Sequence, residues 1–449
     1  MTLGDSLTAE YETIQPISGF DTEPTDYANV THPGWVSMSW VEVLGRTRSG
    51  FFEFGKWRGL SDPWPPPRFS GYARNWAVPG VTASQYADFM TAGFSSNPFY
   101  YVLRRPLDQQ LRDDADRVVI WLGGNELRAN FGAIYDEDND SARAEFVDNL
   151  GDDLIDNLKR IVRHVKDQNS DLEIVLGNVP DLGATPSKKI AHPDPAKRAR
   201  VTAATETINA RIQELADDEN VAVANVYAVT QKLVAGEPFY FGAIKFIDDE
   251  SNDNDPHYLF TNDGLHPNTA LQIQLARTFI RTFNDHYLAG IPQITHAEAL
   301  TLLGINPREP YRQWIQAQGV EAIGLLKDPD GDGMTNLMEY AFGTNPAASD
   351  VGNLPFSRTG PVDGITGDES VTYTPAQGEH RDIEITVQYK VDTTWKAVPA
   401  DHVVTNGQAV TAVIPPTSAP VRLRVKVRLV PPQGSLNNVA TVYLLPPQE

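Results

Sequence analysis

A serine, a histidine and an aspartate in this chain could together form a nucleophilic site. Ser6 lies in the short turn GDSL at residues 4–7. A serine hydroxyl is a weak nucleophile until a neighbouring base removes its proton. Among the nine histidines, we select His266 because Asp263 precedes it by three residues on a glycine-containing turn. This spacing lets the carboxylate contact one ring nitrogen while the other nitrogen faces the serine.

Two further residues could bind the negative charge that develops on a substrate oxygen during acyl transfer. Gly80 lies in the loop of ARNWAVPGVTA, after an expected strand, where its backbone N–H can approach a substrate closely. Asn125 follows the apolar run RVVIWLG (117–123). Because the carboxyl ends of parallel strands meet at one edge of a sheet, Ser6, Gly80 and Asn125 are expected to converge there.

Each of these residues alone also has a simpler structural interpretation. Ser6 could be a helix cap or a turn residue, and Asp263 could cap a helix that starts near Pro267-Asn268. Asn125 could cap the end of a strand. The joint occurrence of all of them favours catalysis over separate structural roles.

Alternating strands and helices are expected to position these residues. Residues 1–290 contain short apolar runs, typical of buried strands, at 117–123, 172–179 and 221–227. Between them lie stretches with apolar residues three and four apart, which predict helices. This alternation predicts an α/β domain with a parallel sheet covered by helices on both faces.

Four separated sequence blocks resemble the GDSL or SGNH hydrolase family over roughly residues 1–285. The blocks are GDSLT with Ser6, the loop with Gly80, GGNE with Asn125, and DGLHPN with Asp263 and His266. The resemblance implies a flavodoxin-like three-layer α/β/α sandwich. It also implies Ser6 as nucleophile, His266 as base and Asp263 as the residue that orients the base. The implied oxyanion hole consists of the Ser6 and Gly80 backbone N–H groups and the Asn125 side chain.

This sequence departs from the family pattern in two places. The third block usually reads Gly-x-Asn-Asp, but Glu126 replaces its aspartate. We expect this change to be tolerated, because the oxyanion role belongs to Asn125. The first strand is short, with only residues 1–3 before the turn, whereas strands usually have about five residues. We therefore expect a leader to have been removed from this chain.

A second motif, DPDGDGMTNLME at residues 328–339, matches the calcium loop pattern D-x-D-x-D-G-x5-E at every position. It resembles the loops of EF-hand, dockerin and thrombospondin type 3 proteins. The expected oxygen ligands are Asp328, Asp330, Asp332, the Met334 carbonyl, Asn336 and Glu339. The alternative is a solvated acidic turn. Because no second loop accompanies it, we expect a structural calcium ion. The resemblance to serine hydrolases implies no catalytic metal or organic cofactor.

The C-terminal part of the chain has a different residue pattern, which is typical of β-strands. Strict alternation in DIEITVQYKV and VRLRVKVRL, together with the hairpin signal Asn406-Gly407, predicts a small all-β sandwich. The expected domains are a hydrolase domain at 1–290, a helical linker with the calcium loop at 291–350, and a β-sandwich module at 351–449. The basic alternation Arg422, Arg424, Lys426 and Arg428 could be a solvated face, a surface that packs on the catalytic domain, or a glycan-binding surface.

Residues 30–76 interrupt the α/β pattern and contain five of the eight tryptophans. We interpret this stretch as an insertion anchored by aromatic packing, with an aromatic wall beside a substrate cleft as the alternative. The five tryptophans are Trp35, Trp40, Trp57, Trp64 and Trp76.

Composition limits the possible partners. The formal net charge is −22, so a nucleic acid backbone would be repelled. Residues 351–449 contain 8 Lys/Arg and 9 Asp/Glu, so nearly all of the negative charge lies in the first 350 residues. There is no cysteine, which excludes disulfides and thiolate metal sites. No apolar run reaches the length of a membrane span.

These observations predict a serine ester hydrolase that acts on short-chain acyl or acetyl esters, whether small molecules or groups on a polysaccharide. The alternatives within the family are a polysaccharide acetyl esterase and a lipase or phospholipase. The alternative of another class is a glycan-binding or adhesion protein with an inactive hydrolase domain. By analogy with secreted bacterial enzymes, we expect an extracellular or periplasmic protein.

Overall fold

The structure is a computed structural model that divides into two compact units. One unit comprises Met1–Phe239 and Lys245–Gly304, and the other comprises Tyr240–Ile244 and Ile305–Glu449. Each unit is described by itself below. The structure describes residues 1–11, 37–58, 71–93, 95–242, 244–250, 255–306, 308–349, 355–362, 364–367, 369–376, 383–391, 393–417, 422–429 and 439–444. Trp35 and Trp64 lie outside these ranges.

A parallel sheet forms the centre of the first unit, with the strand order β1-β4-β5-β6. Its strands are β1 (Thr2–Gly4), β4 (Arg117–Trp121), β5 (Glu173–Gly177) and β6 (Ala222–Ala224). On the free side of β1, Asn75 forms a parallel bridge with Thr2, and Val78 N–H donates to Gly4 O at 2.9 Å. The segment 74–78 therefore extends the sheet beyond β1, and the second segment in the chain lies beside the first, as in a flavodoxin-like order.

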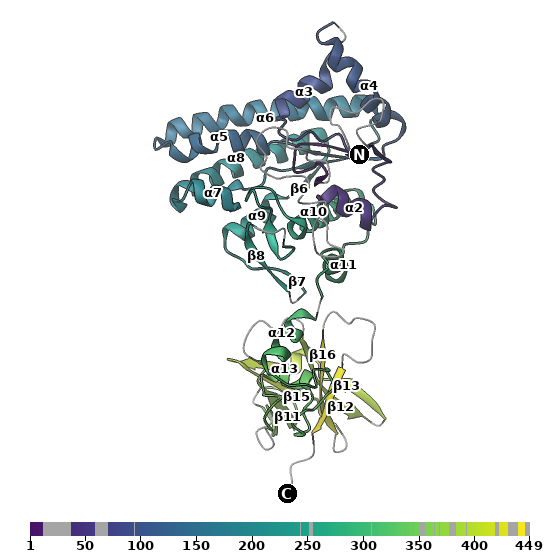
Figure 1. The fold of residues 1–449 in the computed structure, drawn as a ribbon, viewed down its shortest axis with the longest axis vertical. Helices are drawn as coiled ribbons and strands as arrows, with labels where there is room; N and C mark the ends of the chain where they lie inside the picture. The colour runs from purple at the N-terminus through teal and green to yellow at the C-terminus, as the bar shows by residue number, and fades with distance from the viewer. Residues whose placement is uncertain are drawn as a thin grey trace. The chain divides into compact units, whose positions relative to one another are not determined.

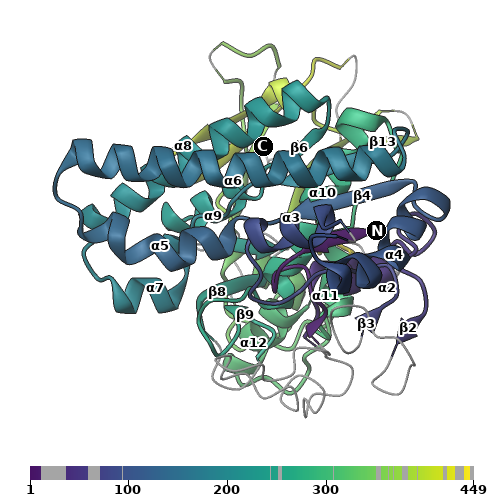
Figure 2. The same ribbon diagram turned by 90° about the horizontal axis from the view of Figure 1, so that it is seen from above.

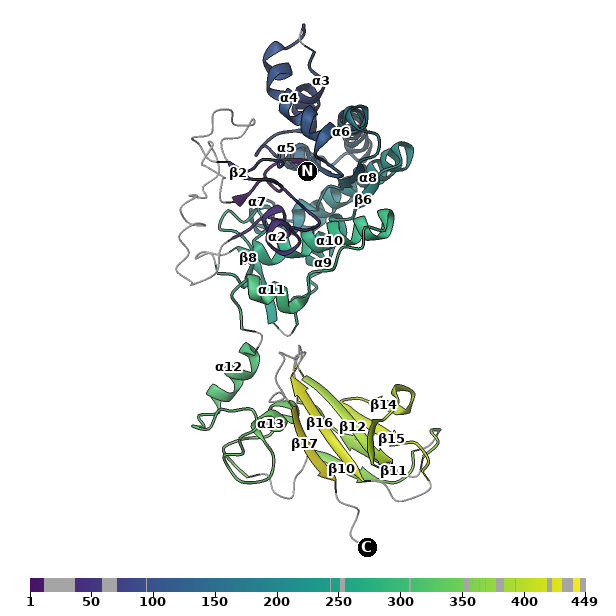
Figure 3. The same cartoon turned by 90° about the vertical axis from the view of Figure 1, so that its right-hand side faces the viewer.

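Helices cover both faces of this sheet (Figures 1 and 3). One face carries α3, α5, α6 and α8, of which α5, α6 and α8 run side by side (Figure 2). The other face carries α2 and α10. The helices of the unit are α2 (Trp40–Thr47), α3 (Ala83–Thr91), α4 (Pro98–Asp113), α5 (Gly124–Asp136), α6 (Asp140–Gln168), α7 (Pro186–Ala191), α8 (Pro195–Glu219), α9 (Tyr227–Val234), α10 (Thr269–Tyr287) and α11 (His296–Leu302), with the 3-10 helix η2 (Leu182–Ala184).

Because side chains alternate along each strand, both faces of the parallel sheet carry apolar residues that pack against helices. Val118 and Ile120 of β4 face the side of α3, α6 and α8 and are buried in one continuous apolar cluster. Trp121 faces the other side, where its ring centroid lies 5.7 Å from that of Phe279 on α10. Trp40 of α2 also packs against Phe279, at 4.3 Å. The expected parallel sheet between two helical layers is thereby confirmed.

A smaller sheet, β7 (Phe239–Phe241), β8 (Ile244–Glu250) and β9 (Tyr258–Phe260), precedes α10 in the chain. The strands β2 (Trp57–Arg58) and β3 (Gly71–Tyr72) form an antiparallel pair. Trp57, Trp40 and Trp76 all lie within the described part of the aromatic stretch. Trp40 and Trp76 are buried at about 1% exposure or less, which fits the packing interpretation better than an open aromatic wall.

The second unit contains two antiparallel sheets with the orders β10-β11-β15-β14 and β13-β12-β16-β17. Leu423, Val425 and Val427 of β16 are fully buried, so they face the interior between the sheets. The expected all-β module is confirmed. The strands are β10 (Phe356–Thr359), β11 (Glu369–Tyr373), β12 (Ile383–Val391), β13 (Thr394–Ala397), β14 (Val403–Asn406), β15 (Ala409–Ile414), β16 (Leu423–Leu429) and β17 (Val439–Leu444).

Short helices complete this unit: α12 (Glu309–Ala317), α13 (Asn336–Phe342) and the 3-10 helix η3 (Ala400–His402). The hairpin signal is correct, because β14 ends at Asn406, β15 begins at Ala409, and Gly407 has a φ of 62°. Among the described residues of the chain, no helix is both long enough and apolar enough to cross a membrane.

Candidate active site

Ser6 lies two residues after the carboxyl end of β1, in a tight turn. The turn closes directly, since Thr8 N–H and Ala9 N–H both donate to Asp5 O, at 3.1 and 3.0 Å. Gly4 permits this closure: a Cβ at that position would lie 2.8 Å from the Thr8 Cβ and 2.9 Å from Trp121 O. Ser6 is therefore held at the sheet edge by a strand end and a turn, with 5% of its surface exposed.

Asp263 and His266 lie on a turn between β9 and α10. Thr261 N–H donates to His266 O at 2.9 Å, and Asn268 N–H donates to Leu259 O at 2.7 Å, so the turn is closed at both ends. Gly264 has a φ of 62°, a left-handed conformation that favours glycine. Sequence spacing alone predicted that these two side chains could meet, and the turn geometry brings them together.

The histidine ring connects the other two residues. His266 Nδ1 is hydrogen-bonded to Asp263 Oδ2, and His266 Nε2 lies 2.9 Å from Ser6 Oγ. The other Asp263 oxygen, Oδ1, accepts from Thr261 Oγ1 at 2.7 Å and from the Leu265 and His266 N–H groups at 2.9 Å each. Both carboxylate oxygens are thus fully occupied, and the ring is held in one orientation.

Electrostatics keep Asp263 ionised. Burial by itself would raise the pKa of this carboxyl, but the charge of His266 and the hydrogen bonds from His266 and Leu265 hold the pKa far below its usual range. An ionised Asp263 keeps the proton on His266 Nδ1 and leaves Nε2 free to accept the Ser6 proton.

Asp263 does not cap the following helix, which was the alternative interpretation. Helix α10 begins at Thr269, and its N-cap is Asn268, whose side chain accepts from Thr269 N–H at 2.7 Å. The simpler structural role of Asp263 is therefore taken by another residue.

Asn125 lies in the first turn of α5, immediately after β4. Its Nδ2 donates to Val81 O at 3.0 Å and has a longer contact of 3.4 Å with Asp5 Oδ2. The first bond attaches the loop that contains Gly80 to the helix. The alternative role of Asn125 at a strand end does not hold, since β4 already ends at Trp121.

Gly80 follows the 74–78 segment and has a φ of 79°. Within the described part of the chain, neither the Gly80 N–H nor the Ser6 N–H donates a hydrogen bond. Gly80 is not among the residues that line the pocket beside Ser6. The structure therefore brings its loop to Asn125 but does not place Gly80 on the pocket wall.

Two carboxyl groups near this loop make contacts that were not predicted from the sequence. Glu126 Oε1 accepts a hydrogen bond from Ala83 N–H at the start of α3, so the residue that departs from the family pattern also holds the Gly80 loop. Asp5 Oδ1 accepts from Leu7 N–H at 2.9 Å. Burial, aided by the negative charge of Glu126, raises the pKa of the Asp5 carboxyl to about 7. The aspartate of the GDSL turn could have drawn attention to Asp5 in the sequence. Its raised pKa, however, depends on contacts with residues far away in the sequence.

A pocket of about 660 Å³, including its open mouth, lies against Ser6 and His266. Its walls are largely apolar, with Leu7, Leu182 and Val229 among them, and Arg128 of α5 lies on the same wall as Asn125. Arg128 and the pocket itself were not predicted, because the lining residues come from separate elements. The pocket gives an acyl or alcohol group a place beside the serine hydroxyl.

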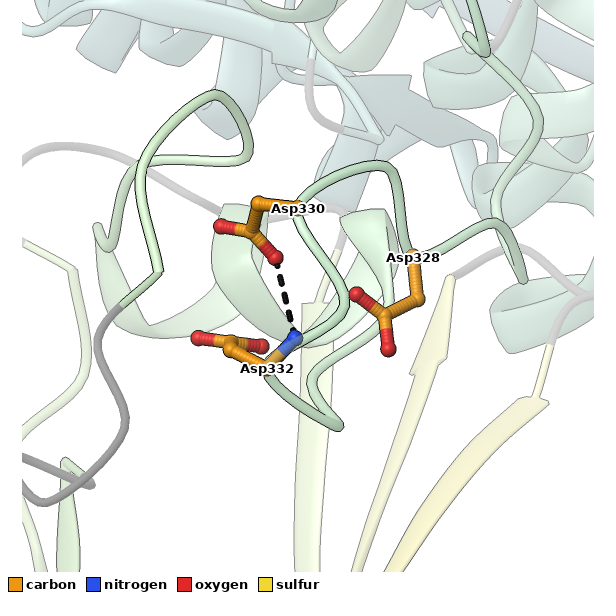
Figure 4. A group of neighbouring side chains, drawn as sticks. All are labelled: Asp328, Asp330 and Asp332. Atoms are coloured by element: carbon orange, nitrogen blue, oxygen red, sulfur yellow. Dashed lines mark hydrogen bonds between the residues drawn. The ribbon is translucent and has the colours of Figure 1, made fainter.

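The three aspartates of the predicted calcium loop lie close together (Figure 4). One carboxylate oxygen each from Asp328, Asp330 and Asp332 lies within 4.8 Å of the others. Gly333, with a φ of 91°, forms the sharp turn between them and α13. Such hard oxygen donors fit Ca²⁺. The loop turns back on itself through Gly333 N–H, which donates to Asp328 Oδ2 at 3.0 Å.

The remaining expected ligands differ in position. Glu339 is completely buried on α13, and the described acidic cluster does not include it. Asn336 Nδ2 donates to the carbonyls of Ala322 and Gly324, at 2.7 and 2.9 Å, so its amide nitrogen faces the preceding loop. Met334 N–H donates to Asp332 Oδ1 at 2.7 Å. The three aspartates thus lie close together, whereas the amide nitrogen of Asn336 contacts protein carbonyls.

Residues 55–272 match the model of the GDSL-like Lipase/Acylhydrolase family. The chain therefore contains a domain of this hydrolase family. The matched range includes Gly80, Asn125, Asp263 and His266, whereas Ser6 precedes it. Comparison with curated proteins finds no match.

The chain is also similar to several solved structures at low identity. An extracellular lipase from Streptomyces rimosus is 15% identical, with a TM-score of 0.35, and the alignment covers 64% of this chain and 97% of the lipase. Phospholipase A1 from Streptomyces albidoflavus NA297 is 13% identical, with a TM-score of 0.34 and coverage of 64% and 97%. An acetyl xylan esterase from Geobacillus stearothermophilus is 14% identical, with a TM-score of 0.29 and coverage of 63% and 92%.

Proposed function

We propose that this protein is a serine carboxylic ester hydrolase that acts through Ser6, His266 and Asp263 on short-chain acyl or acetyl esters. The observation that carries this proposal is the hydrogen bond of 2.9 Å between His266 Nε2 and Ser6 Oγ, with Asp263 bound to the other ring nitrogen, beside an open pocket. The family match supports a hydrolase of this type.

Catalysis would begin when His266 Nε2 takes the Ser6 proton as Oγ attacks the ester carbonyl. The Ser6 and Gly80 N–H groups and Asn125 Nδ2 would stabilise the resulting oxyanion. In the structure the second Nδ2 hydrogen of Asn125 has only the 3.4 Å contact with Asp5, so it is available to a stronger acceptor. His266 would then protonate the leaving alcohol, and water would hydrolyse the acyl-enzyme by the same steps.

The test is hydrolysis of p-nitrophenyl esters from acetate to long acyl chains by wild type, Ser6→Ala and an exposed control, Ser170→Ala. We expect activity that is highest for short chains, unchanged in Ser170→Ala, and reduced at least about 10³-fold in Ser6→Ala. A maximum at long chains would indicate a lipase. Equal rates in wild type and Ser6→Ala would contradict the proposal.

Two alternatives are tested when an acetylated polysaccharide is added to the set of substrates. A polysaccharide acetyl esterase would release acetate from an acetylated polysaccharide more efficiently than from the p-nitrophenyl ester. A glycan-binding protein with an inactive hydrolase domain would release none from either. An unaltered set of Ser6, His266 and Asp263 in hydrogen-bonding contact favours an active enzyme over that second alternative.

We further propose that the loop 328–339 binds a structural Ca²⁺, and that the ion takes no part in ester hydrolysis. The clustered carboxylates of Asp328, Asp330 and Asp332 support this proposal, as does the agreement of the sequence with the calcium loop pattern. Millimolar calcium outside cells would fill even a weak site, in keeping with the extracellular or periplasmic location that we propose. The basic face of β16, with Arg424, Lys426 and Arg428, is also proposed as a surface that binds glycan or packs on the catalytic domain.

A further inference from the structure

Arg128, a positively charged residue of the pocket lining, has no neutralising partner in the described part of the chain. Arg128 lies in the second turn of α5, is exposed, and lines the same pocket as Ser6 and His266. Within the described ranges its guanidinium makes no hydrogen bond and no ion pair. The chain has a net charge of −22, so this is not caused by a shortage of acidic side chains.

Lys188 adds a second positive charge close by. It lies on α7, which is attached to the catalytic turn, because Ser187 N–H donates to Gly264 O at 3.0 Å. Its Nζ lies 4.6 Å from the ring centroid of Phe131, one turn after Arg128 on α5. Burial and the nearby charge of Arg128 lower the pKa of the Lys188 ammonium. The two cations are therefore close enough to repel each other.

Two acidic residues, Asp5 and Asp181, also line the pocket, and neither forms an ion pair with Arg128 in the described part of the chain. Asp181 Oδ1 accepts from Gly183 N–H at 2.7 Å, and Oδ2 accepts from Thr202 Oγ1 and Gln231 Nε2 at 2.6 and 2.8 Å. Both oxygens are thus committed to neighbours that hold η2 and α9. An anion from outside the protein would provide what Arg128 lacks, namely acceptor oxygens for its guanidinium N–H groups.

We propose that the substrate is an ester whose alcohol part carries a carboxylate or phosphate group, and that Arg128 and Lys188 bind this group at the mouth of the pocket. This inference rests on the proposed ester hydrolysis. Phe260 and Leu271, which are 2% and 1% exposed, belong to the buried apolar part of the pocket lining, which suits the acyl group. The alcohol part then extends toward the open side, where Arg128 is exposed.

The experiment compares three acetyl esters that differ in the charge of the alcohol part. The substrates are 4-acetoxybenzoate, 4-acetoxyphenyl phosphate and the neutral methyl 4-acetoxybenzoate. The enzymes are wild type, Arg128→Gln, Lys188→Gln and a control, Arg105→Gln, which changes an exposed arginine of α4 that does not line the pocket. Dividing the kcat/KM of each variant by that of wild type, for each ester, removes the differences in leaving-group reactivity.

For Arg128→Gln we expect kcat/KM to fall about tenfold on the anionic esters, mainly through a higher KM, and for Lys188→Gln about threefold. On the neutral ester both variants should stay within about twofold of wild type. The ester with the larger loss identifies carboxylate or phosphate as the preferred group. Arg105→Gln should change nothing.

An equal loss on neutral and anionic esters, or no loss on the anionic ones, would overturn the inference. If wild type hydrolyses none of the esters, the proposed ester hydrolysis fails, and calorimetric binding of 4-hydroxybenzoate and inorganic phosphate tests the anion site separately. Binding by wild type that is at least about fivefold tighter than binding by Arg128→Gln supports the site. Equal or undetectable binding overturns it.

Discussion

At the scale of single residues, the proposed oxyanion role of Asn125 depends on its hydrogen-bond donors. Its Nδ2 has one firm acceptor in Val81 O and one weak contact with Asp5 Oδ2, so one hydrogen is available to a developing oxyanion. Asn125→Ala should lower kcat about 10²–10³-fold. The rate is measured on p-nitrophenyl acetate, with circular dichroism to check the fold. A wild-type rate in a folded variant would refute the oxyanion role.

Asp5 should make stability depend on pH. Its pKa is raised from 3.8 to about 7 by burial and by Glu126, so the folded state holds this proton more tightly than the unfolded state. The contribution to stability is complete below about pH 4 and is lost as the pH rises through about 7. From about pH 4 to pH 8, wild type should lose up to about 4 kcal/mol of unfolding free energy relative to Asp5→Asn.

Urea unfolding of wild type and Asp5→Asn at several pH values measures this difference. Asp263 and the other titrating groups are present in both proteins, so their contributions cancel to first order. Asp171→Asn, a change at an exposed aspartate, is the matched control and should run parallel to wild type. A constant difference between Asp5→Asn and wild type across this range would contradict the burial effect.

At the scale of elements, the short strand β1 works because the chain turns at once after it. Gly4 leaves no room for a Cβ between Thr8 and Trp121 O. Gly4→Ala should destabilise the protein by about 1–3 kcal/mol and lower kcat, since the displaced turn carries Ser6. Thermal unfolding and p-nitrophenyl acetate hydrolysis measure the two effects. In the control, Gly50→Ala, the added Cβ meets open space. This variant should change neither the unfolding temperature nor kcat.

The first turn of α5 holds the Gly80 loop at two points, Asn125 to Val81 O and Glu126 to Ala83 N–H. Glu126→Ala removes the second link. We expect kcat to fall about tenfold and the unfolding free energy to fall by about 1–3 kcal/mol, because a buried N–H loses its acceptor. Glu126→Gln keeps an acceptor oxygen and should stay close to wild type. If both variants behaved alike, the hydrogen bond to Ala83 would not be what positions the loop.

At the scale of the whole molecule, the two units should respond differently to calcium. If the ion binds the loop 328–339, about a hundredfold excess over Kd should add about 2.7 kcal/mol to the stability of the second unit. Calorimetry in calcium and in EDTA should therefore show one transition that shifts by several degrees, while esterase activity stays constant. Asp332→Asn should abolish the shift, and Asp401→Asn, at an exposed aspartate of η3, should retain it. An identical scan in both buffers would exclude a stabilising ion.

The sequence by itself determined the fold class and the order of the elements, because burial imposes local patterns. Apolar runs predicted β4, β5 and β6, helical periodicity predicted α6 and α8, and strict alternation predicted β12 and β16. The residues Ser6, Asn125, Asp263 and His266 were also predicted from the sequence, since each belongs to a short block with a recognisable turn.

Only the tertiary structure decided what these residues touch. The contact of Ser6 with His266 joins residues 260 positions apart, and the Glu126 bond to Ala83 joins residues 43 apart. The raised pKa of Asp5, the pocket and the unpaired charge of Arg128 within the described part of the chain follow from several elements that meet at one sheet edge. No local pattern encodes such meetings, because burial, dielectric environment and close approach depend on how distant segments pack.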